Sequence, residues 1–380
     1  MNGYGREGVK YLGIGVSIWL MIAGIRTEAG FNLSGSFYHA CVLRGYELSG
    51  SRSIEYGGED ALRLSLKYLP NRDWKLEGSF DLMLLSGDNA DAYIAVSPEA
   101  EEDSFEALGL VLVPRFHARK LYLSYYDDRY TATLGRQIIN YGVGYIFSPI
   151  DCFSTVELQD IGLARKGSDI ARVQAPLGDL SGIEGVTTLH GADNASAVKI
   201  FGNLMDYDLS LTGIYKGAQK EALLGFTFKG DLFNTGIHGE LVEHYRIDAG
   251  AHYFEGMLGA DYSLFGGKVL VLAEYYYNGD PIDPQSLTPE ELLDLNRAFL
   301  GRNYLFGQAY LFFDEIRNLG LSVIYNPSVK SWTGTLQFAY NIMQNTDLFM
   351  YARHYRGDLN GMDAGDALKS ELGARMEWKF

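Results

Sequence analysis

Two histidines and a glutamate stand at alternate positions in one short segment, and such side chains can bind metal ions or transfer protons. They are His238, Glu240 and His244 in the stretch HGELVEH. Apolar and polar residues alternate around them, which predicts a β-strand. In a strand the two histidines lie ~20 Å apart, at ~3.3 Å per residue, too far for one metal ion. We therefore expect no metal site and no cofactor here, and we assign the segment to a polar-lined wall.

A second candidate segment, 133–153, combines charged residues with glycines and aromatic residues. It reads TLGRQIINYGVGYIFSPIDCF. The alternating strand pattern ends after Gln137, and Gly142 and Gly144 permit tight or left-handed backbone. The segment that follows is too apolar for a loop in water. We therefore predict an inner loop at about 138–167 that folds inside a larger structure and narrows it.

The elements around these candidates are strands, because the two-residue period recurs along the chain. The final segment ELGARMEWKF shows it, with Leu372, Ala374 and Met376 on one face and Glu371 and Arg375 on the other. We find about eighteen such segments from Phe31 onward, and sixteen strands remain an alternative. Many run to about ten residues or more, the length that a tilted strand needs to cross a bilayer. The pattern predicts an all-β fold, a transmembrane antiparallel up-and-down β-barrel.

The connections between these segments fall into two classes. Every second connection is a short turn. The other class contains all the long loops, which are the predicted inner loop at about 138–167 and two predicted external loops at about 87–115 and 279–302. This arrangement is typical of bacterial outer-membrane barrels. Residues 88–106 carry seven acidic residues and no lysine or arginine. Such a loop is either simply solvated, or it attracts cations and bridges through them to lipopolysaccharide.

The polar faces of the strands carry both signs of charge, which suits a water-filled lumen. The net charge of −16 excludes a nucleic-acid partner, which needs a basic surface. Pore width and fixed charge would then select a small hydrophilic solute. The residues that we predict to line the lumen are Lys75, Asp81, Lys199, Lys229, His238, Glu240, Arg246, Arg353, Glu371 and Arg375.

The predicted inner loop resembles the L-G-R-Q … W-G … N-P-x-D-x-F signature of outer-membrane porin-like barrels, including the alginate-export-like families. Tyr141 stands at the tryptophan position and Ser148 at the asparagine position. The resemblance implies an inward-folded loop that narrows a substrate channel. A structural ion pair between Arg136 and Asp151 that pins the loop is the alternative role. The motif residues are Gly135, Arg136, Gln137, Tyr141, Gly142, Pro149, Asp151 and Phe153.

The two ends of the chain carry predicted export and assembly signals. Residues 1–29 combine a basic start, a short apolar run and a small-residue cleavage site, which predicts a cleaved signal peptide before a barrel at 30–380. Met376, Trp378 and Phe380 resemble the signal by which the barrel assembly machinery recognises its substrates. We expect a protein of the Gram-negative type of cell outer membrane, in contact with its lipid and lipopolysaccharide.

The functional prediction is a porin-like channel for passive or facilitated diffusion, and two alternatives remain. One is a non-conducting barrel with a structural or adhesive role at the cell surface. The other is a barrel hydrolase, but the chain lacks the G-x-S-x-G segment of serine hydrolases, and we expect no catalytic residue. A homo-oligomer is plausible by analogy with trimeric porins. Pairing of Cys41 with Cys152 stays open.

Overall fold

The computed structural model describes residues 30–48, 51–96, 104–107, 110–154, 167–189, 194–283, 299–357 and 366–380. The predicted signal peptide, parts of all three long loops and the hairpin tip after Leu48 lie outside these ranges. Nineteen strands, one α-helix and one 3-10 turn are assigned within them. The helix is α2 (Asp88–Val96) and the 3-10 turn is η2 (Phe265–Gly267).

The strands follow one another along the chain with few interruptions. They are β1 (Phe31–Leu48), β2 (Ser51–Tyr68), β3 (Trp74–Gly87), β4 (Phe105–Ala107), β5 (Leu110–Tyr126), β6 (Thr131–Gln137), β7 (Ser168–Gly178), β8 (Ser181–Thr188), β9 (Ala195–Leu204), β10 (Tyr207–Lys216), β11 (Glu221–Leu232), β12 (Thr235–Arg246), β13 (Ala251–Leu264), β14 (Val269–Asn278), β15 (Asn303–Phe312), β16 (Arg317–Asn326), β17 (Ser331–Met343), β18 (Thr346–Arg356) and β19 (Asp366–Lys379).

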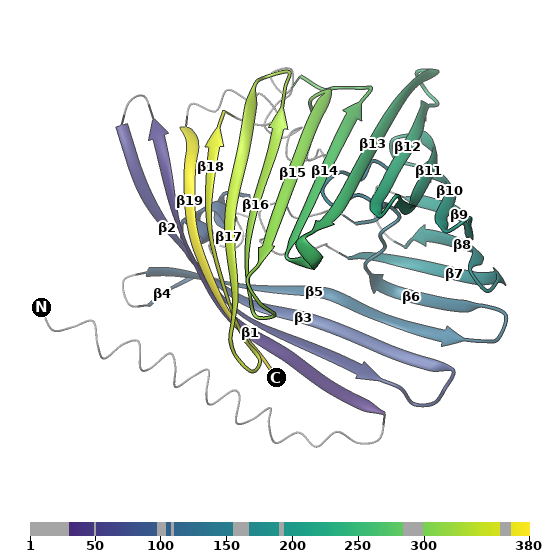
Figure 1. Ribbon diagram of the computed structural model, residues 1–380. Coiled ribbons are helices and arrows are strands. Elements are labelled where there is room, and N and C mark those ends of the chain that lie inside the picture. Colours follow the sequence, from purple (N-terminus) through teal and green to yellow (C-terminus); the bar gives the residue numbers. More distant parts are fainter. Residues whose placement is uncertain are drawn as a thin grey trace, which may run out of the picture.

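These strands close into a barrel of antiparallel neighbours (Figure 1). β3 pairs directly with β5, and the three-residue β4 pairs only with β5, so β4 stands outside the ring. β1 pairs with β19 over most of its length, which closes the ring. The predicted eighteen-strand antiparallel barrel is confirmed, and the sixteen-strand alternative is excluded. Closure gives each of the eighteen described ring strands a partner on both sides, as a wall in lipid requires.

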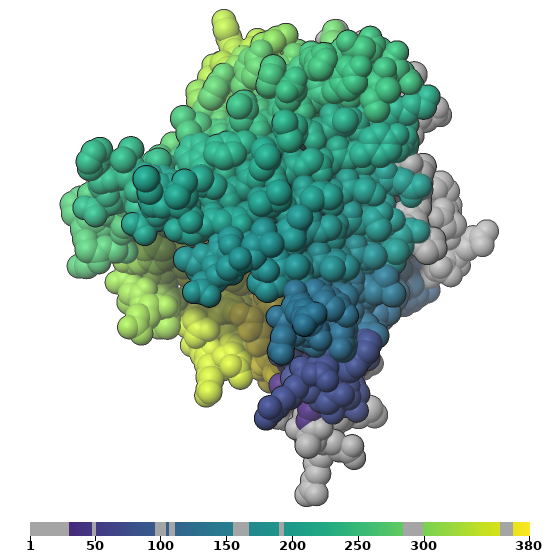
Figure 2. All heavy atoms as spheres, turned by 90° about the vertical axis from the view of Figure 1, so that its right-hand side faces the viewer, coloured from purple at the N-terminus to yellow at the C-terminus, as the bar shows by residue number. Residues whose placement is uncertain are grey.

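The two faces of the wall differ as the alternation predicts. On β19, Leu372 and Met376 are 58% and 54% exposed on the outer face, whereas Glu371, on the inner face, is 6% exposed. The outer face over β7 to β13 is a continuous layer of side chains (Figure 2). Within the described ranges no helix is long and apolar enough to cross a membrane. The exposed fractions on β19 thus place its apolar side chains on the outer face of the sheet.

Three parts of the predicted 87–115 loop are regular structure, namely α2, β4 and the start of β5. β5 begins at Leu110, and it carries Pro114 paired in register with Leu84. α2 lies on the inner side of the wall, where Ala90 packs with Leu85 and Val113. This segment, predicted as an external loop, thus contributes a short helix to the lumen.

Candidate functional site

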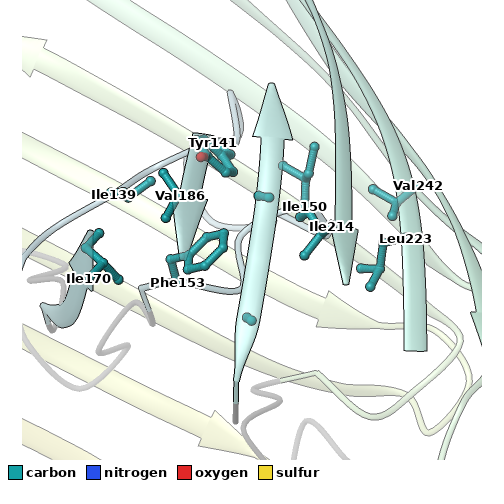
Figure 3. Packing of buried hydrophobic residues seen from close by; sticks show 11 residues of the cluster. Ile139, Tyr141, Ile150, Phe153, Ile170, Val186, Ile214, Leu223 and Val242 are labelled. Atoms are coloured by element: carbon teal, nitrogen blue, oxygen red, sulfur yellow. The ribbon is translucent and has the colours of Figure 1, made fainter. Parts of the chain in front are cut away.

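The inner loop, defined here as residues 138–154, crosses the interior of the barrel and packs against one side of the wall. Ile139, Tyr141, Ile150 and Phe153 are at most 4% exposed. They meet an apolar patch of inward-facing side chains on β7 to β12 (Figure 3). The patch consists of Ile170, Val186, Ala195, Ala197, Ile214, Leu223 and Val242. The apolar composition of the loop is therefore explained by burial against the inner wall.

The middle of the inner loop is anchored by an aromatic cluster on β13 to β15. Phe147 is 1% exposed and stacks on Tyr276 with ring centroids 5.3 Å apart. Phe299, near the end of the 279–302 loop, meets the Phe147 ring edge-on at 4.8 Å. Tyr304 packs against both rings. Two long loops and the wall thus meet in one packed cluster.

Glu240 on β12 accepts hydrogen bonds from the backbone of the inner loop. The N–H groups of Val143, Gly144 and Ile150 donate to its carboxyl oxygens at 2.7, 3.1 and 3.3 Å. The Ser148 hydroxyl donates to the same group at 3.3 Å. Glu240 is 4% exposed, so the loop supplies the polar partners that a buried carboxyl group requires.

Glu274 on β14 holds the next three residues of the loop in the same way. Its oxygens accept the N–H groups of Tyr145, Ile146 and Phe147 at 2.5, 3.1 and 3.3 Å. His238 on β12 lies 3.0 Å from the same carboxyl group. Glu274 is 2% exposed. The two glutamates therefore satisfy backbone donors that this irregular loop leaves unpaired.

The inner loop is also folded on itself at its two ends. Asp151 accepts the N–H of Tyr141 at 2.7 Å, and the Ser154 hydroxyl donates to the Ile139 carbonyl at 2.6 Å. A Cβ on Gly142 would lie 1.7 Å from Ser148 Oγ, so only glycine fits there. Burial raises the pKa of the Cys152 thiol to about 12. Cys41 and Cys152 are both free thiols, which answers the pairing question.

The suggested ion pair between Arg136 and Asp151 is not formed. Arg136 donates to both carboxyl oxygens of Asp169, at 2.9 and 2.6 Å, and it is aligned with the exposed Leu121 on the outer face. Alternation places Arg136 on the side of the wall away from Gln137, which enters the inner loop and is 6% exposed. Gly135, directly before Arg136, has a φ of 119°, a conformation that glycine alone adopts easily.

A cavity of about 490 Å³ lies between the inner loop and the wall of β7 to β11. Lys199 enters it, with its ammonium 4.9 Å from the centre of the Tyr141 ring. Arg172 binds Glu184 across the wall, and Glu184 is 3% exposed. The cavity is a polar chamber beside the loop.

The wall of β18, β19 and β1 carries a charged network. Glu371 accepts from Arg44 Nε at 3.1 Å, from Arg353 at 3.4 Å and from the Tyr355 hydroxyl at 2.6 Å. Arg44 also binds Asp88 of α2. Basic and acidic side chains thus alternate along this wall.

The other predicted lumen residues also lie on inward faces. Lys75 pairs with Glu77 at 2.9 Å. Asp81 receives Arg63 at 2.7 Å, and Arg246 binds Asp280. Lys229 is aligned with His238, and the Arg375 guanidinium lies between the rings of Tyr38 and Phe349.

Several residues of the site were missed by the sequence analysis. Glu274 stands in VLVLAEYYYN, where one acidic residue interrupts an apolar run, and that interruption was the available signal. Glu184 and Arg172 lie on strands in which polar and apolar residues simply alternate, so nothing in the sequence distinguished these two from other polar residues of the wall. Of the residues that the structure describes, no three histidine, cysteine or acidic side chains are grouped as metal ligands.

Comparisons with known proteins agree with this geometry at the level of the fold. No protein-family model and no curated protein sequence matches the chain. Among solved structures, it is similar to OccAB4 of Acinetobacter baumannii (TM-score 0.57, 7% identity, 92% of this chain and 98% of that chain). It is likewise similar to OpdL of Pseudomonas aeruginosa (TM-score 0.57, 10% identity, 93% of this chain and 99% of that chain). It is also similar to OccAB1 of A. baumannii (TM-score 0.55, 10% identity, 92% of this chain and 96% of that chain). The likeness shows the barrel fold, and at this identity it shows the fold alone.

Proposed function

We propose that the chain forms an outer-membrane channel for small hydrophilic solutes, and that the inner loop is its constriction. The observation that carries the proposal is the attachment of the loop to Glu240 and Glu274 inside the barrel. A loop fixed by buried hydrogen bonds and apolar packing keeps one position, so it sets a constant pore width.

The mechanism that we propose is passive. The loop covers the wall of β7 to β15, and the opposite wall of β17 to β3 keeps Arg63, Arg353 and Glu371 on its inner face. A solute passing between them would exchange part of its hydration shell for these fixed groups, which makes pore width and local charge the selective elements.

The finer points of the sequence analysis belong to this proposal. We infer export through the signal peptide at 1–29 and cleavage near its end. The resemblance of the inner loop to alginate-export-like barrels also stays a prediction. Three of its motif residues, Tyr141, Gly142 and Asp151, take part in the packing and hydrogen bonding of the loop, whereas a fourth, Arg136, faces outward.

Single-channel recording of the purified full-length barrel in planar bilayers tests the proposal. We expect discrete conductance steps, and a larger step after deletion of 140–150. Removing Ala218 and Gln219, which shortens the β10–β11 turn to two residues, is the matched control, because both residues are exposed in a connection between two neighbouring strands, and it should leave the step size unchanged. Absence of discrete steps from correctly folded protein would contradict the channel and favour a surface structural or adhesive barrel.

A further inference from the structure

An ion pair lies on the outer, lipid-facing side of the barrel. His39 Nδ1 on β1 is 2.8 Å from Asp60 Oδ1 on β2. The two residues are aligned across the strand pair, with Met376 of β19 beyond His39 and Leu84 of β3 beyond Asp60. Met376 is exposed on the outer face, and the side chains of His39 and Asp60 are 54% and 44% exposed. The pair is thus presented to whatever surrounds the barrel.

The pair lies within the apolar band of the wall. His39 is eight residues beyond Phe31, the start of β1. At ~3.3 Å per residue and a tilt of ~40°, it stands ~20 Å along the membrane normal, inside a band ~25 Å tall. Outward apolar side chains continue on both sides, with Phe37 below it and Leu43 above it. The pair is therefore surrounded by apolar surface.

Such a position is unfavourable if lipid is the only neighbour. A charged side chain on the lipid face is unfavourable, most so at mid-depth and less toward the interfaces. A charge pair inside a membrane normally meets protein or a water-filled cavity. Two other outward pairs lie on other parts of the wall, Arg136 with Asp169 on β6 and β7 and Glu243 with His252 on β12 and β13.

The surface beside the pair is flat enough for close contact. Cys41 on β1 is aligned with Ala374 on one side and Gly58 on the other, so three small residues adjoin the pair on the same face. Strands β19, β1 and β2 run side by side there (Figure 1). Small residues permit two walls to approach closely within a membrane.

We propose that this face, β19 to β2, is the contact surface for a second copy of the same chain. The argument for that occupant is charge complementarity. A two-fold axis parallel to the membrane normal sets His39 of one copy opposite Asp60 of the other, because the two residues lie side by side at one level of the wall. Each charge then gains a second partner, and neither faces lipid. An isologous contact of this kind is the usual form of a symmetric dimer.

Cys41 provides a native reporter of this contact, because it is the outward thiol on the proposed surface. Outer membranes carrying the full-length chain are treated with a short bismaleimide and analysed on denaturing gels. We expect a cross-linked dimer that is lost in Cys41→Ser and retained in Cys152→Ser. The dimer fraction should not change when expression is lowered. A fraction that falls in proportion to expression, or no dimer although a monofunctional maleimide labels Cys41, would overturn the proposal.

The double variant His39→Leu/Asp60→Leu tests whether this ion pair lies in a contact between two copies of the chain or faces lipid. We expect it to lower the dimer yield about tenfold or more, an effect of about 1.4 kcal/mol. The matched control is His252→Leu/Glu243→Leu, which removes an outward pair of the same chemistry on β12 and β13 and should leave the yield unchanged. If the first double variant keeps the wild-type yield, lipid covers the face. The heat-dependent gel shift of each variant confirms that its barrel has folded.

Discussion

Glu240 and Glu274 lie on alternate strands of the barrel wall, β12 and β14, and between them accept six backbone N–H groups of one loop. His238, the inward residue two before Glu240, also reaches Glu274. The two carboxyl groups act together as a fixed socket for residues 143–150. The same loop would otherwise carry unpaired donors into a partly apolar interior, at a cost of about 1–3 kcal/mol each.

Replacing the two glutamates should release the inner loop without unfolding the barrel. Hydrogen bonds to charged groups contribute about 1.5–3 kcal/mol each. We expect Glu240→Ala/Glu274→Ala to give larger and noisier single-channel steps than the wild type. Each single variant should fall between the two, because the other glutamate still holds part of the loop.

Glu77→Ala is the control for this experiment. Glu77 also lies on the inner wall, where it pairs with Lys75 and Lys120, and among the described residues no hydrogen bond or ion pair joins it to the inner loop. Its loss should leave open-channel noise unchanged. Equal noise in the double variant and the wild type would show that apolar packing alone holds the loop.

The Glu371 network predicts a change in ion selectivity. Glu371→Gln removes the negative charge that lies between Arg44 and Arg353 on the lumen wall. One unit charge at ~4 Å contributes about 1 kcal/mol in water. We therefore expect the anion-to-cation permeability ratio, from the reversal potential in a KCl gradient, to rise roughly twofold to fivefold. Glu243→Gln removes the same charge from the outer face and is the control. A comparable change in its permeability ratio would show that the effect of Glu371→Gln does not depend on the position of the charge in the lumen.

The partly buried thiol of Cys152 in the inner loop predicts slow alkylation. Its pKa of about 12 leaves far less thiolate at pH 8 than an ordinary cysteine with a pKa of about 8.5. In a Cys41→Ser background, Cys152 in the folded barrel should react with iodoacetamide on the order of 10³-fold more slowly than in urea, because only the thiolate attacks. The rate should keep rising with pH beyond 9. Similar rates in the folded and unfolded protein would mean that the loop does not bury Cys152.

The strands could be predicted from the sequence because the two-residue period is a local property of a wall with lipid on one side. Leu372 and Glu371 illustrate it, and both lie on the expected faces. The start of β5 was missed because Pro114, which normally interrupts a strand, lies in the ladder. β1 and β2 also extend further toward each other than predicted, since Gly57 and Gly58 weaken the pattern there.

The inner loop was predictable in place but not in attachment. An apolar segment with Pro149 and two glycines indicates burial, yet its partners are 90 residues or more away in the sequence, at Glu240 and Glu274. Local patterns carry no information on such distant pairs. Arg136 was predicted as part of the inward-folded loop motif. It instead lies on β6, where the alternation of side chains along the strand places it on the outer face beside Asp169.

Phe380, the residue after the end of β19, pairs with Gly35 of β1, where the first and last strands of the barrel meet. Its N–H donates to the Gly35 carbonyl at 2.9 Å, and its carbonyl accepts the Gly35 N–H at 2.9 Å. Its ring also covers Gly35, where an added Cβ would lie 2.7 Å from the ring. Phe380→Asp should therefore reduce the amount of assembled barrel in the outer membrane, while channels that do assemble keep the wild-type conductance.

Two further variants distinguish the contribution of the Phe380 ring from that of the backbone pairing between Phe380 and Gly35. Phe380→Leu keeps an apolar side chain and should assemble better than Phe380→Asp. Gly35→Val should impair assembly, because a Cβ there meets both the Phe380 ring and the Arg63 carbonyl, the latter at 2.4 Å. The measurement is the heat-modifiable fraction on gels of isolated outer membranes. Normal assembly of Gly35→Val together with poor assembly of Phe380→Asp would indicate that Phe380 acts in recognition by the assembly machinery rather than in closing β19 onto β1.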